Sequence, residues 1–256
     1  MPNDQRPIPR VDYDAVASAF DKRYDHQRYE QVERAVRRFV ETHDLPAVLE
    51  VGCGTGHWLA AIAELATVVV GVDRSLEMLR RAVATAPQAL LAQATAEAIP
   101  LGRARFDRVF CVNALHHFPD PATFLAECRR LLRPDGAFLS IGLDPHTGID
   151  SWWIYDYFPG ALVADRRRYL ATPRLREMLV AAGFSAPRTE IVQHLPAERE
   201  FDVAVERGHL ERHSTSQLMV ISDAEYEAGM RRLREERPIL RADLRLYATI
   251  AELPPR

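Results

Sequence analysis

Short apolar runs alternate with helical patterns through the first half of the chain. Residues 48–51 and 67–73 are apolar runs of strand length, and the second is rich in β-branched residues. Three further runs predict strands at 89–92, 106–113 and 137–142. Between these runs, apolar residues recur three and four positions apart, as they do on one face of a helix. Strands that alternate with helices predict an α/β fold built on a parallel sheet.

The same spacing predicts helices at 13–20, 29–40, 75–86, 121–132 and 172–182. In the third of these, Leu76, Leu79, Ala82 and Val83 are expected to form the buried face. Helix starts are predicted at Asp120-Pro121, Thr172-Pro173 and the capping box Ser222-Asp223-Ala224-Glu225.

The periodicity fails after Gly142, and residues 144–168 are predicted to form a long loop rich in aromatic side chains. A segment of this kind inside a compact domain is usually functional. Its aromatic faces suit a planar or apolar substrate, or they form a small satellite core. Arg166, Arg167 and Arg168 are expected on a solvated face. Beyond this segment the pattern predicts a strand at 186–195, helices at 201–212 and 222–237, and a strand at 243–251.

A glycine-rich turn follows the first strand, with the sequence Glu50-Val51-Gly52-Cys53-Gly54-Thr55-Gly56. Glycines take positive φ and let the backbone approach a ligand closely. A strand, such a turn and a helix make a nucleotide-type site, but the spacing is not the G-x-G-x-x-G of dinucleotide sites. The Glu50 carboxylate repels a pyrophosphate and favours a ligand with cationic or donor groups. S-adenosylmethionine (SAM), with its sulfonium and ammonium, is such a ligand.

The turn resembles the first motif of the class I SAM-dependent methyltransferases. Residues 94–101 resemble that family's adenine turn, 106–117 its fourth strand, and 131–139 its L-L-R-P-G-G turn. The likeness is greatest to the group with the ubiquinone and menaquinone C-methyltransferases and other small-molecule, methyltransferase type 11 enzymes. It implies a Rossmann-like mixed sheet of seven strands, strand seven antiparallel, with helices on both faces and a helical substrate cap.

The resemblance also implies which residues hold SAM. Glu50 is expected to steer the methionyl ammonium, and Gly52, Cys53 and Gly54 to bring the backbone to the methionyl part. Asp73 closes the second strand at the distance where an acid accepts bonds from a ribose diol, although helix capping also explains an aspartate there. The other implied cofactor residues are Arg74 beside the adenosine, Thr95, Ala96 and Glu97 around the adenine, Asn113 near the sulfonium, and Tyr13 and Tyr24 in the N-terminal helices.

Thr95 stands where the family usually has aspartate, so the usual carboxylate at the adenine is missing. For Tyr13 and Tyr24, the alternative to cofactor contact is ordinary core packing or exposure.

Two adjacent histidines, His116 and His117, follow the fourth strand. They are expected at the carboxyl edge of the sheet, where open α/β sheets bind ligands. A histidine pair without carboxylate or cysteine partners is a poor metal site, so no metal is predicted. His117 is a candidate general base, because imidazole titrates near neutral pH. The alternative is a structural role for the pair beside the cofactor.

Composition sets the remaining expectations. With 256 residues, a net charge of −3 and a pI of about 6.3, the chain has no basic field that favours nucleic acid. Cys53, Cys111 and Cys128 match neither a metal nor a disulfide pattern, which suits a reducing compartment. No signal peptide and no membrane span are apparent. We therefore expect a cytoplasmic monomer or homodimer.

A single methyltransferase domain is expected over 1–256. Within it, 1–45 form a helical cover, 46–143 the SAM-binding core, 144–171 and 196–241 the substrate cap, and 172–195 and 242–256 the rest of the sheet.

The expected function is methyl transfer from SAM to an O, N or C atom of a small-molecule acceptor, aromatic or apolar, in bacterial secondary or cofactor metabolism. S-adenosylhomocysteine (SAH) is then the product, and catalysis is an in-line displacement that depends mainly on orientation. Two alternatives stay open. One is a SAM-binding protein that does not methylate, such as a cyclase, a decarboxylase or a regulatory partner. The other is an NAD(P) oxidoreductase, against which the glycine spacing and Glu50 argue.

Overall fold

The computed structural model describes residues 11–21, 29–41 and 44–255. The chain divides into two compact units. The sheet unit comprises Tyr13–Asp144, Tyr169–His194 and Arg245–Arg256, and the helical unit comprises Met1–Asp12, Pro145–Arg168 and Leu195–Leu244.

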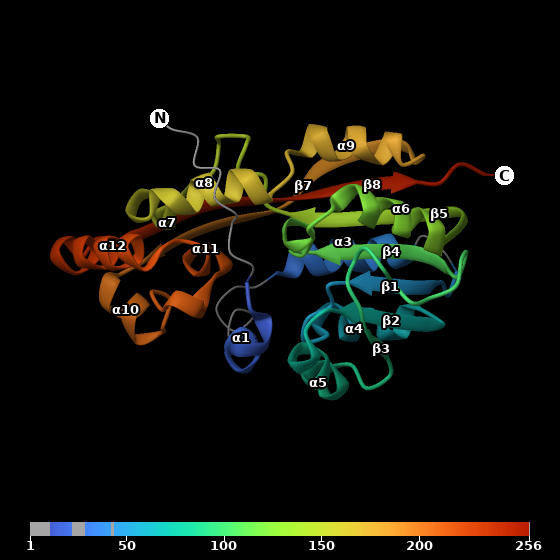
Figure 1. Cartoon of the computed structure of the whole chain (residues 1–256), viewed down its shortest axis with the longest axis horizontal. Helices are drawn as coiled ribbons and strands as arrows, with labels where there is room; N and C mark the ends of the chain where they lie inside the picture. The colour runs from blue at the N-terminus through green and yellow to red at the C-terminus, as the bar shows by residue number, and fades with distance from the viewer. Residues whose placement is uncertain (1–10, 22–28, 42–43, 256) are drawn as a thin grey trace. The chain divides into compact units, whose positions relative to one another are not determined.

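A mixed sheet forms the centre of the sheet unit (Figure 1). Five parallel strands are β1 (Ala47–Val51), β2 (Val68–Asp73), β3 (Leu90–Gln93), β4 (Phe106–Val112) and β5 (Leu132–Gly142). Their order is β3-β2-β1-β4-β5, and β8 (Leu240–Glu252) pairs antiparallel with β5. β7 (Ser185–Arg199) pairs with β8. The predicted α/β fold with a late antiparallel strand is confirmed.

The central strands are largely apolar because both of their faces are covered, and charged residues in β4 are confined to Asp107 and Arg108 near its start. All of β4 is buried, and Val48 to Val51 of β1 are buried as well. Glu50 is the exception in this apolar run, and it pairs with Gly71 of β2 and Phe110 of β4. A carboxyl group therefore lies in the middle one of the five parallel strands.

The strand order reverses between β1 and β4. From β1 the chain runs outward to β2 and β3, and from β4 it runs the other way to β5. With right-handed crossovers, α4 (His57–Ala61) and α5 (Leu76–Thr85) cover one face and α6 (Pro121–Leu131) the other. Such a reversal opens a crevice at the carboxyl ends of β1 and β4.

Further helices complete the sheet unit. They are α1 (Tyr13–Phe20), α3 (Glu30–Glu41), α9 (Thr172–Ala181) and the 3-10 turns η1 (Ala63–Leu65) and η2 (Leu115–His117). α9 packs against α6, and its Leu175 and Leu179 share one apolar core with Phe124 and Phe138.

Two local predictions in this unit are corrected. In α5 the buried residues are Met78, Leu79 and Ala82, whereas Leu76 and Val83 are exposed. The buried face is therefore rotated around the helix axis relative to the predicted one. Thr172 does not cap α9, because it is the first helical residue and Ala171 occupies the N-cap position; the Thr172 amide instead donates to the buried Asp144 carboxylate at 2.7 Å.

The cap predicted at α6 is confirmed. The Asp120 side chain accepts from the amides of Ala122 and Thr123 at 3.0 and 3.1 Å.

The helical unit has its own apolar core. Its elements are β6 (Ser151–Trp152), α7 (Trp153–Tyr157), α8 (Pro159–Arg168), α10 (Phe201–Glu206), η3 (Arg212–Ser214), α11 (Ser216–Met219) and α12 (Asp223–Glu236). Within this unit β6 pairs with the start of β8. The core contains Ile154, Phe158, Leu218 and Leu233, and the aromatic residues of 152–157 pack against it.

The prediction of a loop at 144–168 is therefore wrong, because α7 and α8 occupy most of it. The sequence of α8 shows no apolar stripe, because the residues that this helix buries are Ala161, Ala164 and the charged Asp165. Of the three arginines expected on a solvated face, Arg168 instead forms an ion pair with Asp165, with 7% of its side chain exposed. In the described residues, no helix combines the length and apolar character needed to cross a bilayer.

Candidate functional site

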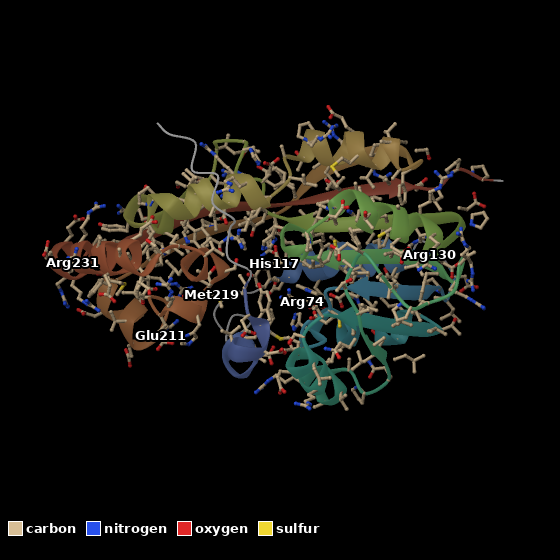
Figure 2. All side chains as sticks on the ribbon, in the orientation of Figure 1. Arg74, His117, Arg130, Glu211, Met219 and Arg231 are labelled. Carbon is tan, nitrogen blue, oxygen red and sulfur yellow. The ribbon has the colours of Figure 1, made fainter. Side chains whose placement is uncertain are left out.

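The predicted site residues gather at the carboxyl edge of the parallel strands. Glu50 lies near the end of β1, Asp73 ends β2, Thr95 follows β3 and Asn113 follows β4. Figure 2 labels Arg74 and His117 near this edge and Arg130 at the opposite one. Residues far apart in sequence thus meet where the strand order reverses.

The glycine turn has a geometry that only glycine fits. Gly52 has φ 76°, and a Cβ there would lie 2.6 Å from Cβ of Ala114 in the β4 loop. The amides of Gly52 and Cys53 both donate to the carbonyl of Val72, at 2.7 and 3.1 Å. Gly54 has φ 53° and donates its amide to Oδ2 of Asp73 at 2.8 Å. The turn is thereby fastened to the end of β2.

Glu50 is fully buried, and neither of its carboxylate oxygens has a hydrogen-bond partner among the described residues. Burial raises the pKa of this carboxyl well above its ordinary range, and the charge of Asp73 raises it further. A buried carboxylate without donors is costly, so the group is either protonated or met by a donor that the described residues do not supply. An ammonium group is such a donor.

Asp73 is held by backbone amides on both of its oxygens. Oδ1 accepts from Ser75 and Oδ2 from Gly54, each at 2.8 Å. Burial raises the pKa of Asp73, and these amide hydrogen bonds oppose the rise. A carboxylate accepts about four hydrogen bonds, so Asp73 retains capacity to accept from a hydroxyl group of a ligand.

The loop after β3 holds the predicted adenine residues. Thr95 is exposed and forms an isolated bridge with Ala98, and Ala96 is buried. Oε1 of Glu97 accepts from the amide of Asp120 at 3.4 Å, so this carboxylate braces the start of α6. Arg74, on the neighbouring loop, is exposed.

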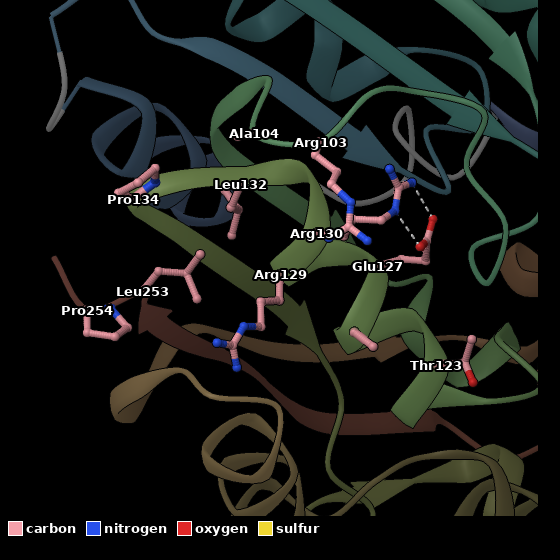
Figure 3. A pocket seen from close by; sticks show the side chains of 11 residues that line it. Arg103, Ala104, Thr123, Glu127, Arg129, Arg130, Leu132, Pro134, Leu253 and Pro254 are labelled. Carbon is pink, nitrogen blue, oxygen red and sulfur yellow. Dashed lines mark hydrogen bonds and ion pairs between the residues drawn. The ribbon is translucent and has the colours of Figure 1, made fainter. Parts of the chain in front are cut away.

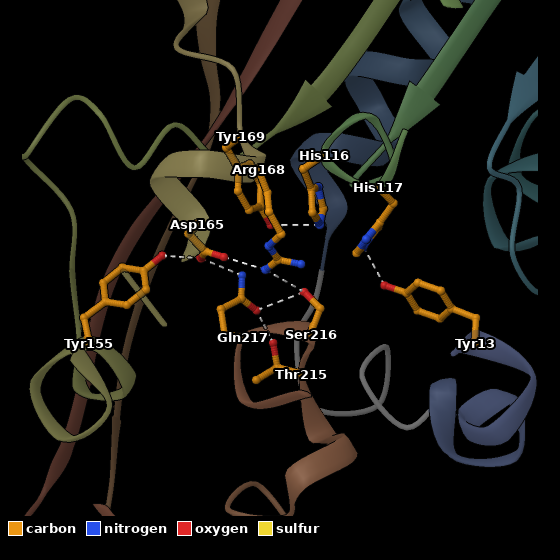
Figure 4. Close-up of polar contacts among 10 residues, drawn as sticks. All are labelled: Tyr13, His116, His117, Tyr155, Asp165, Arg168, Tyr169, Thr215, Ser216 and Gln217. Carbon is orange, nitrogen blue, oxygen red and sulfur yellow. Dashed lines mark hydrogen bonds and ion pairs between the residues drawn. The ribbon is translucent and has the colours of Figure 1, made fainter. Parts of the chain in front are cut away.

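Asn113 and the two histidines form the loop after β4. Asn113 has φ 49°, a conformation that asparagine tolerates better than most residues, and its amide donates to the Ile141 carbonyl at 2.7 Å. The rings of His116 and His117 have their centres 3.9 Å apart. His116 also stacks on Tyr169, and its Nε2 lies 3.1 Å from the Tyr169 hydroxyl (Figure 4).

Helix α1 reaches this edge as well. The Tyr13 hydroxyl lies 2.6 Å from Nε2 of His117, and the two rings meet edge to face (Figure 4). Asp14 contacts the Ser75 hydroxyl at 2.5 Å, and Asp21 contacts the Thr55 hydroxyl at 2.5 Å. Tyr24 lies outside the described residues.

Sequence reasoning missed five residues at this edge, namely Asp14, Asp21, Thr55, Ser75 and Tyr169. Only Ser75 carries a local signal, because its hydroxyl accepts from the Met78 amide three residues later, as a helix cap does. The others depend on contacts between distant segments. Among the described residues, no group of three or more histidines, cysteines and acids is arranged to hold a metal.

A pocket of about 560 Å³ lies at the other edge of the sheet (Figure 3). Its walls come from residues around the starts of β4 and β5, including Arg103, Arg130 and Pro134. The Arg130 guanidinium in this pocket donates hydrogen bonds to Glu127 and to the carbonyls of Ile99 and Leu101. None of the predicted cofactor residues lines this pocket.

The chain is similar in sequence to known methyltransferases. Residues 49–140 match the model of the family described as "Methyltransferase domain". A Mycolicibacterium smegmatis protein named "Probable S-adenosylmethionine-dependent methyltransferase" is 28% identical over 198 residues, which cover 76% of this chain and 72% of that protein. A ubiquinone biosynthesis O-methyltransferase of Haemophilus ducreyi is 38% identical over 103 residues. That match covers 36% of this chain and 44% of the relative, less than half of its length.

Solved structures share the fold. Phosphoethanolamine N-methyltransferase 2 of Haemonchus contortus, in complex with SAH, has a TM-score of 0.61 and 17% identity, covering 94% of this chain and 57% of that one. The [4+2]-cyclase SpnF also has a TM-score of 0.61 and 17% identity, covering 98% of this chain and all of its own. Residues 49–140 thus match a methyltransferase domain, and the fold is the one seen in these solved structures.

Proposed function

We propose that the protein transfers the methyl group of SAM to an O, N or C atom of a small-molecule acceptor, with His117 as the base for acceptors that arrive protonated. The curated relatives support a small acceptor, since one of them is a ubiquinone biosynthesis O-methyltransferase.

One observation carries the cofactor assignment. Glu50 is buried, no described residue donates a hydrogen bond to it, and it lies beside Asp73 at a turn whose backbone tolerates no Cβ at Gly52. A ligand with a cationic group and hydroxyl groups can neutralise Glu50 and donate hydrogen bonds to Asp73. SAM has an ammonium for Glu50 and a ribose diol for Asp73, so the residues present fit it.

SAM, when bound, supplies a methyl group on a sulfonium, which is already an activated donor. The chain therefore has to orient the donor and the acceptor, exclude water and accept a proton where one is released. In this proposal Glu50 and Asp73 orient the cofactor, and the backbone of Gly52, Cys53 and Gly54 borders its methionyl part.

The remaining cofactor residues border the adenosine and the sulfonium end. Arg74, Thr95, Ala96 and Glu97 belong to the adenosine side, and Asn113 to the sulfonium end.

The proton route follows from the Tyr13–His117 contact. Nε2 of His117 is engaged by the Tyr13 hydroxyl at 2.6 Å, so a proton from the acceptor reaches the imidazole through this hydroxyl. Tyr13 gives its own proton to Nε2 and takes the proton of the acceptor, and the imidazole becomes imidazolium. An acceptor that arrives already ionised needs neither group.

The test combines binding and turnover. SAM binding is measured by isothermal titration calorimetry, and SAH formation by mass spectrometry across a panel of phenols, quinols, amines and carboxylates. Asp73→Asn should weaken SAM binding by about ten- to hundredfold, as loss of charge-assisted hydrogen bonds does. Asp135→Asn, at an exposed position near the start of β5, is the matched control and should leave the affinity unchanged.

A second function is supported by the likeness to a cyclase over almost the whole chain. SAM is then a bound structural or electrostatic group, and the acceptor panel yields no SAH. Tight SAM binding without turnover on the panel favours this reading. Unchanged SAM affinity in Asp73→Asn contradicts the assignment of the cofactor site in both readings.

A further inference from the structure

Residues 13–21, called here the α1 segment, contain two carboxylates, Asp14 and Asp21. Each of them is hydrogen-bonded to one of the two loops whose amides bind the Asp73 carboxylate. Oδ1 of Asp14 accepts from the Ser75 hydroxyl at 2.5 Å and from the Glu77 amide at 3.2 Å. These two donors lower the pKa of Asp14, so it is ionised at neutral pH. Ser75 caps α5 by accepting from Met78, and its amide donates to Asp73. One serine therefore contacts both the helix α1 and the carboxylate assigned to the ribose.

The second carboxylate meets the glycine turn. Asp21, directly after α1, has its Oδ1 2.5 Å from the hydroxyl of Thr55. Thr55 is 1% exposed and follows Gly54, whose amide donates to the other oxygen of Asp73. The Phe20 ring lies 3.6 Å from where a Cβ of Gly54 would be, so α1 also covers this turn. Each end of the α1 segment is thus bonded to one of the two loops that hold Asp73.

We propose that Asp14 and Asp21 are positioning residues of the cofactor site, which hold α1 against the Ser75 and Thr55 loops and so set how long SAM and SAH stay bound. This inference rests on the proposed function. Both hydrogen bonds exist only while α1 lies on the loops, and a cofactor seated at Asp73 lies next to both loops. Loss of either carboxylate therefore accelerates dissociation more than it changes association.

The experiment measures dissociation directly. Wild type, Asp14→Asn and Asp21→Asn are loaded with radiolabelled SAM and chased with excess unlabelled SAM, and the retained label is followed over time. Each variant should lose label about two- to fivefold faster, the range for exposed charged contacts. Glu30→Gln, at an exposed acid of α3 that pairs with Arg34, is the matched control and should release SAM at the wild-type rate.

A double-mutant cycle separates positioning from simple stability. Ser75→Ala removes the hydroxyl that donates to Asp14 at 2.5 Å and the cap of α5, and it leaves only the longer bond from the Glu77 amide, so it lowers the melting temperature whatever Asp14 does. If Asp14 acts through Ser75, Asp14→Asn adds little to the dissociation rate of Ser75→Ala. Additive rates in this cycle, or wild-type retention of label in both single variants, overturn the proposal.

Hydrogen exchange gives an independent reading. With saturating SAM, the amides of residues 13–21 should exchange faster in Asp14→Asn and Asp21→Asn than in wild type. Equal exchange contradicts the proposal even if the rates of label loss differ. If SAM binds and is released slowly at the same rate in wild type and in both variants, the proposed function stands and this inference is contradicted. If wild type does not bind SAM, both are contradicted.

Discussion

The hydroxyl of Tyr13 lies 2.6 Å from Nε2 of His117, although 104 residues separate them in the chain. The contact joins the first described helix to the loop after β4. It gives an imidazole at the candidate site a partner that can carry a proton. It also restricts how an acceptor reaches the imidazole, because the nitrogen is covered by the phenol.

This contact predicts how the rate depends on the acidity of the acceptor. With phenols of decreasing pKa, His117→Ala and Tyr13→Phe should each lower kcat for the least acidic phenols by about 10²- to 10⁴-fold. For phenols that are ionised at the assay pH, the loss should be small, because no proton has to be removed. The measurement is the slope of log kcat against phenol pKa for each variant.

His194→Ala is the control, since His194 is an exposed histidine on β7. It should reproduce the wild-type slope. Parallel plots for wild type, His117→Ala and Tyr13→Phe would show that these side chains position the substrate without moving a proton.

The parts of the site that depend on adjacent residues could be predicted from sequence. The glycine turn, Glu50 and Asp73 lie within 24 residues of one another, and strand and turn chemistry brings them to one edge of the sheet. The contacts of Asp14 and Tyr169 could not be predicted, because a carboxylate in a helix or a tyrosine in a loop carries no sign of a partner 50 or more residues away. Such pairs are fixed by the tertiary fold.

The same reason explains the missed helices of the helical unit. A helix is recognised by an apolar stripe, and α8 buries a charged residue, Asp165, on the face where the stripe is expected. The charge is tolerated there because Tyr155, Gln217 and Arg168 supply hydrogen bonds to it. Polar networks of this kind replace the pattern from which helices are predicted.

Glu50 predicts a pH dependence of cofactor binding. Its pKa is raised above the ordinary 4.5 in the ligand-free protein, mainly by burial. A cationic partner favours the carboxylate form and lowers the pKa of Glu50 in the complex, so SAM binding releases a proton when the pH lies between the pKa of the complex and the raised pKa of the ligand-free protein. The affinity for SAM should therefore rise with pH, by at most about tenfold per unit, until the raised pKa is passed. Calorimetry in two buffers of different ionisation enthalpy measures the released proton directly.

The Glu50 carboxyl has the opposite effect on the stability of the ligand-free protein. Because the folded pKa is the higher one, the folded state retains the proton longer, and stability falls as pH rises from 4.5 towards the raised value. Glu50→Gln should remove this part of the pH dependence and abolish proton release. Asp73 and Cys53 also face Glu50, and both have pKa values raised by burial, so the comparison with Glu50→Gln isolates the glutamate. Equal proton release in the variant would contradict this account.

Gly52 predicts a stability cost with two separable parts. Gly52→Ala forces a Cβ to within 2.6 Å of Ala114 and places alanine at φ 76°. Gly148 has nearly the same φ of 71° but no atom within 4 Å of the added Cβ, so Gly148→Ala carries the backbone cost alone. We expect about 1–2 kcal/mol from backbone strain in both variants and about 1–3 kcal/mol more at Gly52 from the clash. Urea unfolding of the two variants measures the difference, and equal values would show that Ala114 moves away freely.

The buried pair Asp165–Arg168 predicts the largest loss of stability. Its side chains are 0% and 7% exposed, and Asp165 also accepts from Tyr155 at 2.7 Å and from Gln217 at 2.9 Å (Figure 4). Asp165→Asn leaves the Arg168 charge buried without its counterion, so the free energy of unfolding should fall by roughly 3–5 kcal/mol.

Asp165→Asn combined with Arg168→Met should be less destabilising than Asp165→Asn alone, because no buried charge remains. The exposed pair Arg174–Glu177 has the same i,i+3 spacing, with side chains 62% and 66% exposed, and is the matched control. Glu177→Gln should change the free energy of unfolding by less than about 1 kcal/mol. The prediction is contradicted if, in urea unfolding, Asp165→Asn lowers the free energy of unfolding no more than Glu177→Gln does. The Asp165–Arg168 pair then contributes no more than a surface ion pair, and the apolar core alone stabilises the helical unit.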